Sequence, residues 1–128
     1  MTSTSGATDP LLTPFKLGNR TAKNRIFSSG HALSHAVHGR ATETTLRYQM
    51  EKAKGGIGLS FVGGSGTVSI DTAPVFDQLI IDDDIIPFFS ELSDFYHQRD
   101  ALLMTQITHL GRRTNANAGE WVPIVAPS

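Results

Sequence analysis

Residues 41–63, ATETTLRYQMEKAKGGIGLSFVG, run from a helix pattern through a glycine stop into an apolar strand pattern. Apolar residues recur at intervals of four and three in the first half, which places them on one face of a helix. They are Leu46, Met50 and Ala53. Gly55-Gly56 predicts the end of that helix. The apolar run at 58–63 has turn residues at both ends and predicts a buried strand.

The segment that follows repeats this order of elements. Three carboxylates at 82–84 favour the positive end of a second helix, and Pro87 fits its first turn. His97 and Arg99 close the helix with basic groups. Its apolar stripe consists of Phe88, Leu92 and Phe95. Residues 102–107, LLMTQI, then predict another buried strand.

Tight turns divide the chain upstream of the first helix. Gly18-Asn19 accepts the positive φ values of a hairpin turn, so residues 15–25 predict a short hairpin. Residues 25–29, RIFSS, predict a short strand. The segment 30–40 is small, rich in histidine and broken by glycine, and we interpret it as a loop.

The spacing of the strands indicates a parallel sheet. Strands starting near Ile26, Leu59 and Leu102 are 33 and 43 residues apart, which leaves room for a crossover helix in each interval. An open doubly wound sheet and a (β/α)8 TIM barrel both begin in this way. A complete barrel needs about 250 residues. The chain is therefore expected to hold only the hairpin, about three strands and two helices of such a barrel.

Composition excludes several classes of protein. The chain has 128 residues, a net charge of -1 and no Cys, so a disulfide framework, a Cys zinc site and a thiol nucleophile are excluded within it. The balanced charge argues against nonspecific nucleic-acid binding. Residues 1–10 resemble a disordered polar leader, and 11–128 form one domain with no membrane span. We expect a cytoplasmic protein without nucleic-acid or membrane partners.

Two motifs favour structural interpretations over ligand sites. The glycine run GGIGLSFVGGSG lacks the third glycine of a dinucleotide-binding fingerprint, so a helix stop and a close turn at Gly63-Gly64 explain it. His31, His35 and His38 have helical spacing that could serve zinc, but glycines bracket the segment and no carboxylate completes the set. No metal site is predicted there.

Four patterns in order resemble the amino-terminal part of the Old Yellow Enzyme family (NADH:flavin oxidoreductases). They are LLTPFKLGNRTAKNRI, LRYQMEKAKGGIGL, FVGGSGTV and LMTQITHLGRR, with VAPS at the end of the chain. The family is a (β/α)8 barrel that binds FMN at the carboxyl ends of its strands, and its amino-terminal hairpin matches residues 15–25. The loop after the first strand is similar to that of the iron-sulfur members, such as trimethylamine dehydrogenase, dienoyl-CoA reductase and N-methylproline demethylase.

The resemblance assigns roles to particular residues. The positions that match flavin contacts are Ser28, Ser29, Gly30, His31, Gly64 and Gln106. Gln106 matches the glutamine that pairs with the pyrimidine edge of the flavin, and an amide suits that edge because it offers both a donor and an acceptor. On pattern alone, Gln106 could equally be a satisfied core amide. His109 and Arg112 match a segment on the substrate side. No catalytic residue is assigned.

The resemblance also implies a function with open alternatives. Ala32 stands where some relatives carry a cysteine, so FMN is expected to bind noncovalently. The implied activity is NAD(P)H-linked reduction of an unsaturated small molecule, and the alternative within the family is oxidative amine demethylation or dehydrogenation. An iron-sulfur cluster is expected only in a further carboxyl-terminal part. A third alternative is an inactive fragment that self-associates, as a homo-oligomer or larger assembly, through its sheet edges.

Overall fold

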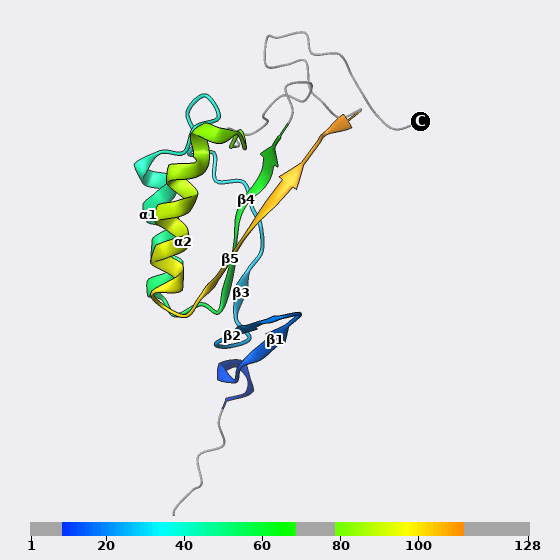
Figure 1. The fold of residues 1–128 in the computed structure, drawn as a ribbon, viewed down its shortest axis with the longest axis vertical. Coiled ribbons are helices and arrows are strands. Elements are labelled where there is room, and N and C mark those ends of the chain that lie inside the picture. Colours follow the sequence, from blue (N-terminus) through cyan, green and yellow to red (C-terminus); the bar gives the residue numbers. More distant parts are fainter. Residues whose placement is uncertain (1–8, 69–78, 112–128) are drawn as a thin grey trace, which may run out of the picture.

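The computed structural model describes residues 9–68 and 79–111, which form a hairpin and a parallel sheet backed by two helices (Figure 1). The hairpin consists of β1 (Phe15–Leu17) and β2 (Arg20–Ala22), which pair antiparallel as predicted. The sheet has the order β3-β4-β5, and both pairings are parallel. The parallel sheet predicted from the strand spacing is thereby confirmed.

The amino-terminal part of the described chain contains two short elements. Pro10–Leu12 form a 3-10 helix, which Asp9 caps by accepting a hydrogen bond from Leu11 N at 2.9 Å. Most of the predicted leader lies outside the described residues. β3 (Phe27–Ser28) is shorter than the predicted strand at 25–29, and Ile26 O just before it accepts a hydrogen bond from Gly58 N at 3.0 Å.

Helix α1 (Glu43–Lys54) begins at a reciprocal cap formed by two threonines. Thr42 Oγ1 accepts from the Thr45 backbone N–H, and Thr45 Oγ1 accepts from that of Thr42, each at 3.3 Å. The cap satisfies two N–H groups that have no partner within the helix. Gly55 ends the helix as predicted. The apolar stripe faces the core, with Leu46 and Ala53 buried.

Helix α2 (Ile86–His97) begins just after the acidic residues, and Pro87 lies in its first turn as predicted. The acidic residues do not enter the helix itself, because Asp83–Ile85 form a separate 3-10 turn, capped by Asp82. Asp82 and Asp84 instead form ion pairs with Arg40, which holds the pKa of the Asp82 carboxyl below its usual value. These carboxylates therefore fasten the loop at 30–40 to the start of α2.

Strand β4 (Leu59–Thr67) continues past the predicted turn at Gly63-Gly64. Val62 pairs with Thr105 and Gly66 with Ile107, so four steps along β4 match two steps along β5 (Leu102–Thr108). This irregularity is a bulge that absorbs the extra residues without ending the strand. Gly64 consequently lies inside a strand and not at its end.

The two helices cover one face of the sheet, on the left in Figure 1. Leu92 and Tyr96 of α2 are completely buried there, and Val62 of β4 is 1% exposed. Tyr96 also donates a hydrogen bond to the backbone carbonyl of Gln49 at 2.8 Å, which ties α2 to α1. Burial in this layer raises the pKa of the Tyr96 phenol.

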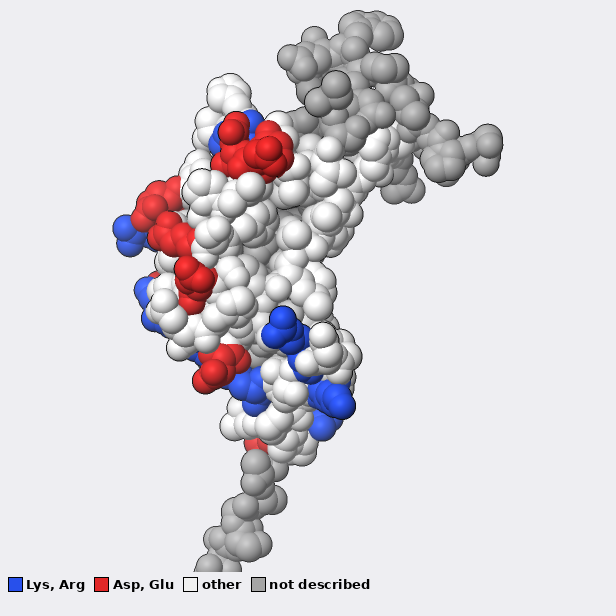
Figure 2. All heavy atoms as spheres, in the orientation of Figure 1, with Lys and Arg blue, Asp and Glu red and all other residues white. Residues whose placement is uncertain are grey.

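The opposite face of the sheet is not covered by the described residues. Phe27 is 63% exposed there, and an apolar groove of about 400 Å³ runs between the strands and the hairpin. On the side of the molecule shown in Figure 2, carboxylates gather over the helix layer, and Lys and Arg side chains gather around the hairpin. None of the described helices is long and apolar enough to cross a membrane.

Candidate functional site

The loop after β3 passes very close to Gly63 of β4 and to the Gln106 side chain of β5. A Cβ atom built on Gly30 would lie 2.6 Å from Gln106 Oε1 and 2.6 Å from the carbonyl oxygen of Gly63. Real Cβ contacts are not this short, so only glycine fits at position 30 in this geometry. The loop after β3 is thereby packed against the backbone of β4 and the Gln106 side chain of β5.

Gly64 makes a second close approach to the same loop. A Cβ atom at Gly64 would lie 2.6 Å from the Ala32 backbone nitrogen and 2.8 Å from the carbonyl carbon of His31. The chain at 29–32 therefore lies flat against β4, with no side chain between them. Backbone packed in this way forms a thin surface on which a planar ligand can lie.

Gln106 lies near the carboxyl end of β5, where parallel sheets bind ligands. The residue is exposed, and its amide oxygen is beside Gly30. It occupies the same strand face as Met104, two positions earlier, and so projects toward the open face and away from the helices. Its amide is thus available to a ligand and is not a satisfied core group.

Ser28 and His31 turn their side chains toward helix α1. Lys52 Nζ donates to Ser28 Oγ at 3.0 Å, and His31 Nε2 lies 2.9 Å from the hydroxyl of Tyr48. Ser29 is exposed, and its carbonyl lies 3.0 Å from His31 Nδ1. For Ser28, only the backbone remains available to the open face.

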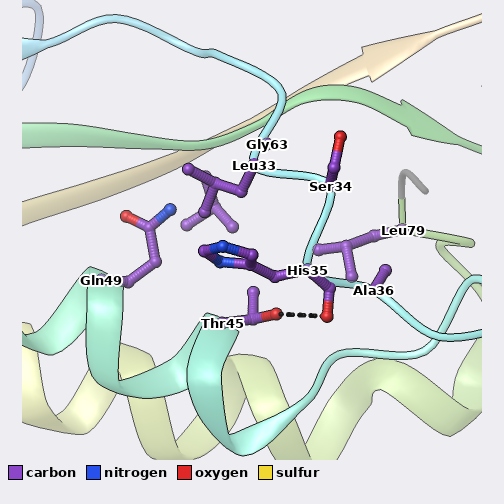
Figure 3. Close-up of a pocket in the computed structure, with 9 residues that line it drawn as sticks. Leu33, Ser34, His35, Ala36, Thr45, Gln49, Gly63 and Leu79 are labelled. Carbon is purple, nitrogen blue, oxygen red and sulfur yellow. Dashed lines mark hydrogen bonds between the residues drawn. The ribbon is translucent and has the colours of Figure 1, made fainter. Parts of the chain in front are cut away.

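A separate small cavity lies behind this loop, between α1 and β4 (Figure 3). Its volume is about 20 Å³, enough for one water molecule but far too small for a flavin. Figure 3 shows the side chains of His35 and Gln49 directed toward each other across it. Gln49 is 1% exposed, and neither its amide atoms nor His35 Nδ1 have a hydrogen-bond partner among the described residues.

This geometry, in which a loop glycine and a glycine of β4 make close backbone contacts beside the Gln106 amide, agrees with the family comparison. The model of the NADH:flavin oxidoreductase / NADH oxidase family matches residues 10–128. The chain belongs to this family.

Curated relatives are similar over nearly the whole chain. A probable N-methylproline demethylase from Rhizobium meliloti (strain 1021) is 41% identical over 121 residues, which are 94% of this chain and 18% of the relative. A multifunctional alkene reductase/demethylase from Caballeronia cordobensis is 43% identical over 126 residues, which are 98% of this chain and 19% of the relative. The chain thus spans about a fifth of the length of these relatives.

Solved structures confirm the fold class. The old yellow enzyme from Trypanosoma cruzi superposes with a TM-score of 0.73 at 27% identity, and the match covers 84% of this chain and 29% of that one. The neighbours are TIM barrels of this flavin oxidoreductase family. The hairpin, three parallel strands and two helices of this chain correspond to one part of such a barrel.

The remaining candidates from the sequence are the substrate-side pair His109 and Arg112 and the histidines weighed for zinc. His109 is exposed and accepts a hydrogen bond from Gly111 N at 3.0 Å, and Arg112 lies outside the described residues. His38 is exposed in a turn with a positive φ. No three His, Asp or Glu side chains within residues 9–68 and 79–111 lie close enough together to hold a metal ion.

Two residues of α1 contact β3 and the loop after it but were not predicted from the sequence. Tyr48 and Lys52 are four residues apart and therefore lie on the same side of the helix. The i, i+4 pairing of an aromatic with a cation was the available signal, and the loop partners depend on tertiary structure.

Proposed function

We propose that this chain forms one side of the cofactor site in an FMN-dependent oxidoreductase that passes hydride from NAD(P)H to an unsaturated small molecule. The observation that carries the proposal is the close packing of the loop at 30–32 against Gly63-Gly64 of β4, with the Gln106 side chain of β5 beside Gly30. The flat backbone there fits a planar ring, and the exposed amide fits an edge that needs both a donor and an acceptor. The residues present therefore suit FMN.

Each part of the chain has a defined task in this proposal. The backbone at 28–31 and Gly64 support the ring face, and Gln106 orients the ring by donating through Nε2 and accepting through Oε1. FMN, when bound, supplies the hydride chemistry through its N5 atom, and the protein supplies orientation. Because the chain has no Cys, none of its residues can form a thioether bond to the cofactor, and binding is noncovalent.

His109 and Arg112 belong to the substrate side in this proposal. Both follow directly after β5, past the residue that orients the ring. A histidine and an arginine supply donors to an anionic or carbonyl group of a substrate. We infer a cytoplasmic enzyme for small molecules, with no nucleic-acid or membrane partner.

Oxidative amine demethylation is the second candidate. The names of the relatives support it, because the Rhizobium relative is a probable demethylase and the Caballeronia relative combines reduction with demethylation. The same cofactor site serves both directions of hydride flow. Full-length protein would separate them by its turnover of an N-methylated amine and of an activated alkene.

Replacing Gln106 tests the cofactor site directly. In the full-length protein, Gln106→Leu keeps the volume but removes both amide partners, so we expect FMN binding to weaken by about 1 to 3 kcal/mol. Gln98→Leu is the matched control, because Gln98 is an exposed glutamine at the end of α2. Equilibrium titration of the apoprotein measures both. An unchanged FMN affinity in Gln106→Leu would overturn the assignment.

A further inference from the structure

We propose that Tyr48 and Lys52 of α1 are positioning residues, which close a ring of contacts with Ser28, Ser29 and His31 and thereby fix the loop at 29–32 beneath the cofactor. This inference rests on the proposed function for its link to FMN. The ring itself is a property of the protein alone. We call it the α1 clasp and define it by these five residues.

The first half of the clasp starts at Lys52. Its ammonium donates to Ser28 Oγ at 3.0 Å and lies 4.8 Å from the centre of the Tyr48 ring. Ser28 Oγ in turn donates to the carbonyl of Ser29 at 3.4 Å. A cation over an aromatic face is attracted by the negative potential of the ring. Lys52 therefore holds both β3 and Tyr48.

Lys52 differs in this from its neighbour two positions along the helix. Lys54 is paired with Glu51 at 2.6 Å, whereas among the described residues no carboxylate pairs with Lys52. Lys52 is also half-buried, and this burial lowers the pKa of its ammonium. A partly buried cation without a carboxylate depends on its hydroxyl and ring partners, so the two contacts of Lys52 are its main compensation for lost water.

The second half of the clasp fixes the tautomer of His31. Its Nδ1 lies 3.0 Å from the Ser29 carbonyl, which can only accept, so Nδ1 carries the proton. In the neutral ring Nε2 then accepts, and the Tyr48 hydroxyl at 2.9 Å donates to it. The two rings meet edge to face, with centroids 5.8 Å apart. Every hydrogen bond of the α1 clasp therefore has a defined donor and a defined acceptor.

Both halves end on the same acceptor, the carbonyl of Ser29. Ser28 Oγ and His31 Nδ1 both reach it, and Tyr48 and Lys52 join those two side chains through α1. The peptide between Ser29 and Gly30 is thus held from the helix side. Gly30 packs its other side against Gly63 and Gln106. Loss of contacts in the clasp would move this loop relative to the Gln106 amide, which orients the flavin in the proposed site.

The decisive variant is Tyr48→Phe, which removes one hydroxyl and keeps the ring that Lys52 contacts. Tyr96→Phe is its matched control, because Tyr96 also donates one hydrogen bond but has no contact with the loop. We expect Tyr48→Phe to release Nε2, so that NMR of the His31 ring shows a mixture of tautomers in place of the Nδ1–H form. Tyr96→Phe leaves that signal unchanged.

FMN affinity supplies the second readout in the full-length protein. We expect Tyr48→Phe and Lys52→Met to weaken FMN binding by about 3- to 10-fold, the effect of losing one hydrogen bond, while Tyr96→Phe and Lys54→Met leave it unchanged. An Nε2–H tautomer of His31 in the unmutated protein, or an FMN affinity unaffected by Tyr48→Phe, would overturn the proposal. If the unmutated protein binds no FMN, the proposed function fails, and the tautomer still decides whether the clasp exists.

Discussion

The two faces of the parallel sheet both carry apolar side chains but have very different surroundings. On the helix side, Leu92 and Tyr96 are fully buried against Ser60 and Val62 of β4. On the other side, Phe27 and Met104 are 63% and 40% exposed. Parallel strands are apolar on both faces, because both are buried in a complete α/β fold. The contacts on the helix side therefore stabilise the described structure. The apolar side chains on the open side are of the kind that is buried in a complete α/β fold.

Truncating one core residue tests this division most strongly. Leu92→Ala removes a completely buried side chain from the helix side and should lower the free energy of unfolding by about 3 kcal/mol. Phe27→Ala removes a larger side chain from the open side, and we expect a cost below about 1 kcal/mol, because little of its area is buried. Urea denaturation of the 128-residue chain measures both, and equal costs would contradict the comparison.

The open face should make the 128-residue chain self-associate. Apolar side chains and strand edges that meet water promote pairing between copies. We expect oligomers that grow with concentration in chromatography coupled to light scattering. Phe27→Ser should weaken the association by about tenfold, the effect of removing one exposed apolar side chain from an interface. A yellow, monodisperse monomer would show that the open face does not behave as described.

A smaller effect is expected from the tyrosine hydroxyl that links the two helices. Tyr96→Phe removes its hydrogen bond to the Gln49 carbonyl and should lower the free energy of unfolding by about 1 kcal/mol. Burial raises the Tyr96 pKa, so folding favours the protonated phenol. This contribution is complete below the ordinary tyrosine pKa of about 10 and is lost as the pH rises above it. Unfolding measured from pH 8 to 11 should therefore show a steeper decline for the unmutated chain than for Tyr96→Phe.

The sequence predicted the helices and strands well because their patterns are local. The stripes of α1 and α2, the stop at Gly55 and the position of Gln106 near a strand end all follow from spacing. The course of β4 did not, because a glycine pair that signals a turn also permits a bulge, and only pairing with β5 distinguishes them. The ion pairs of Arg40 with Asp82 and Asp84 could not be predicted either, because Arg40 is distant from them in sequence.

The candidate site was predicted in part for the same reason. The resemblance indicated Gly30, Gly64 and Gln106, which the fold brings together at one sheet edge. Spacing could not indicate that the Ser28 and His31 side chains face α1, because a two-residue strand followed by a loop has no usable periodicity. Contacts between a helix face and a loop depend on tertiary packing, which a single sequence does not display.

The close approach of Gly30 to its neighbours has a practical consequence for enzyme engineering. In a mutant library that varies this loop to change substrate range, neighbouring positions differ in the space they leave for larger side chains. Ser29 and Ala32 are exposed and can take larger side chains without moving the sheet. Any side chain at Gly30 or Gly64 would push backbone or Gln106 aside, so diversity at these two codons produces mostly misassembled variants. Screening effort is best concentrated on codons 29 and 32, with 30 and 64 held constant.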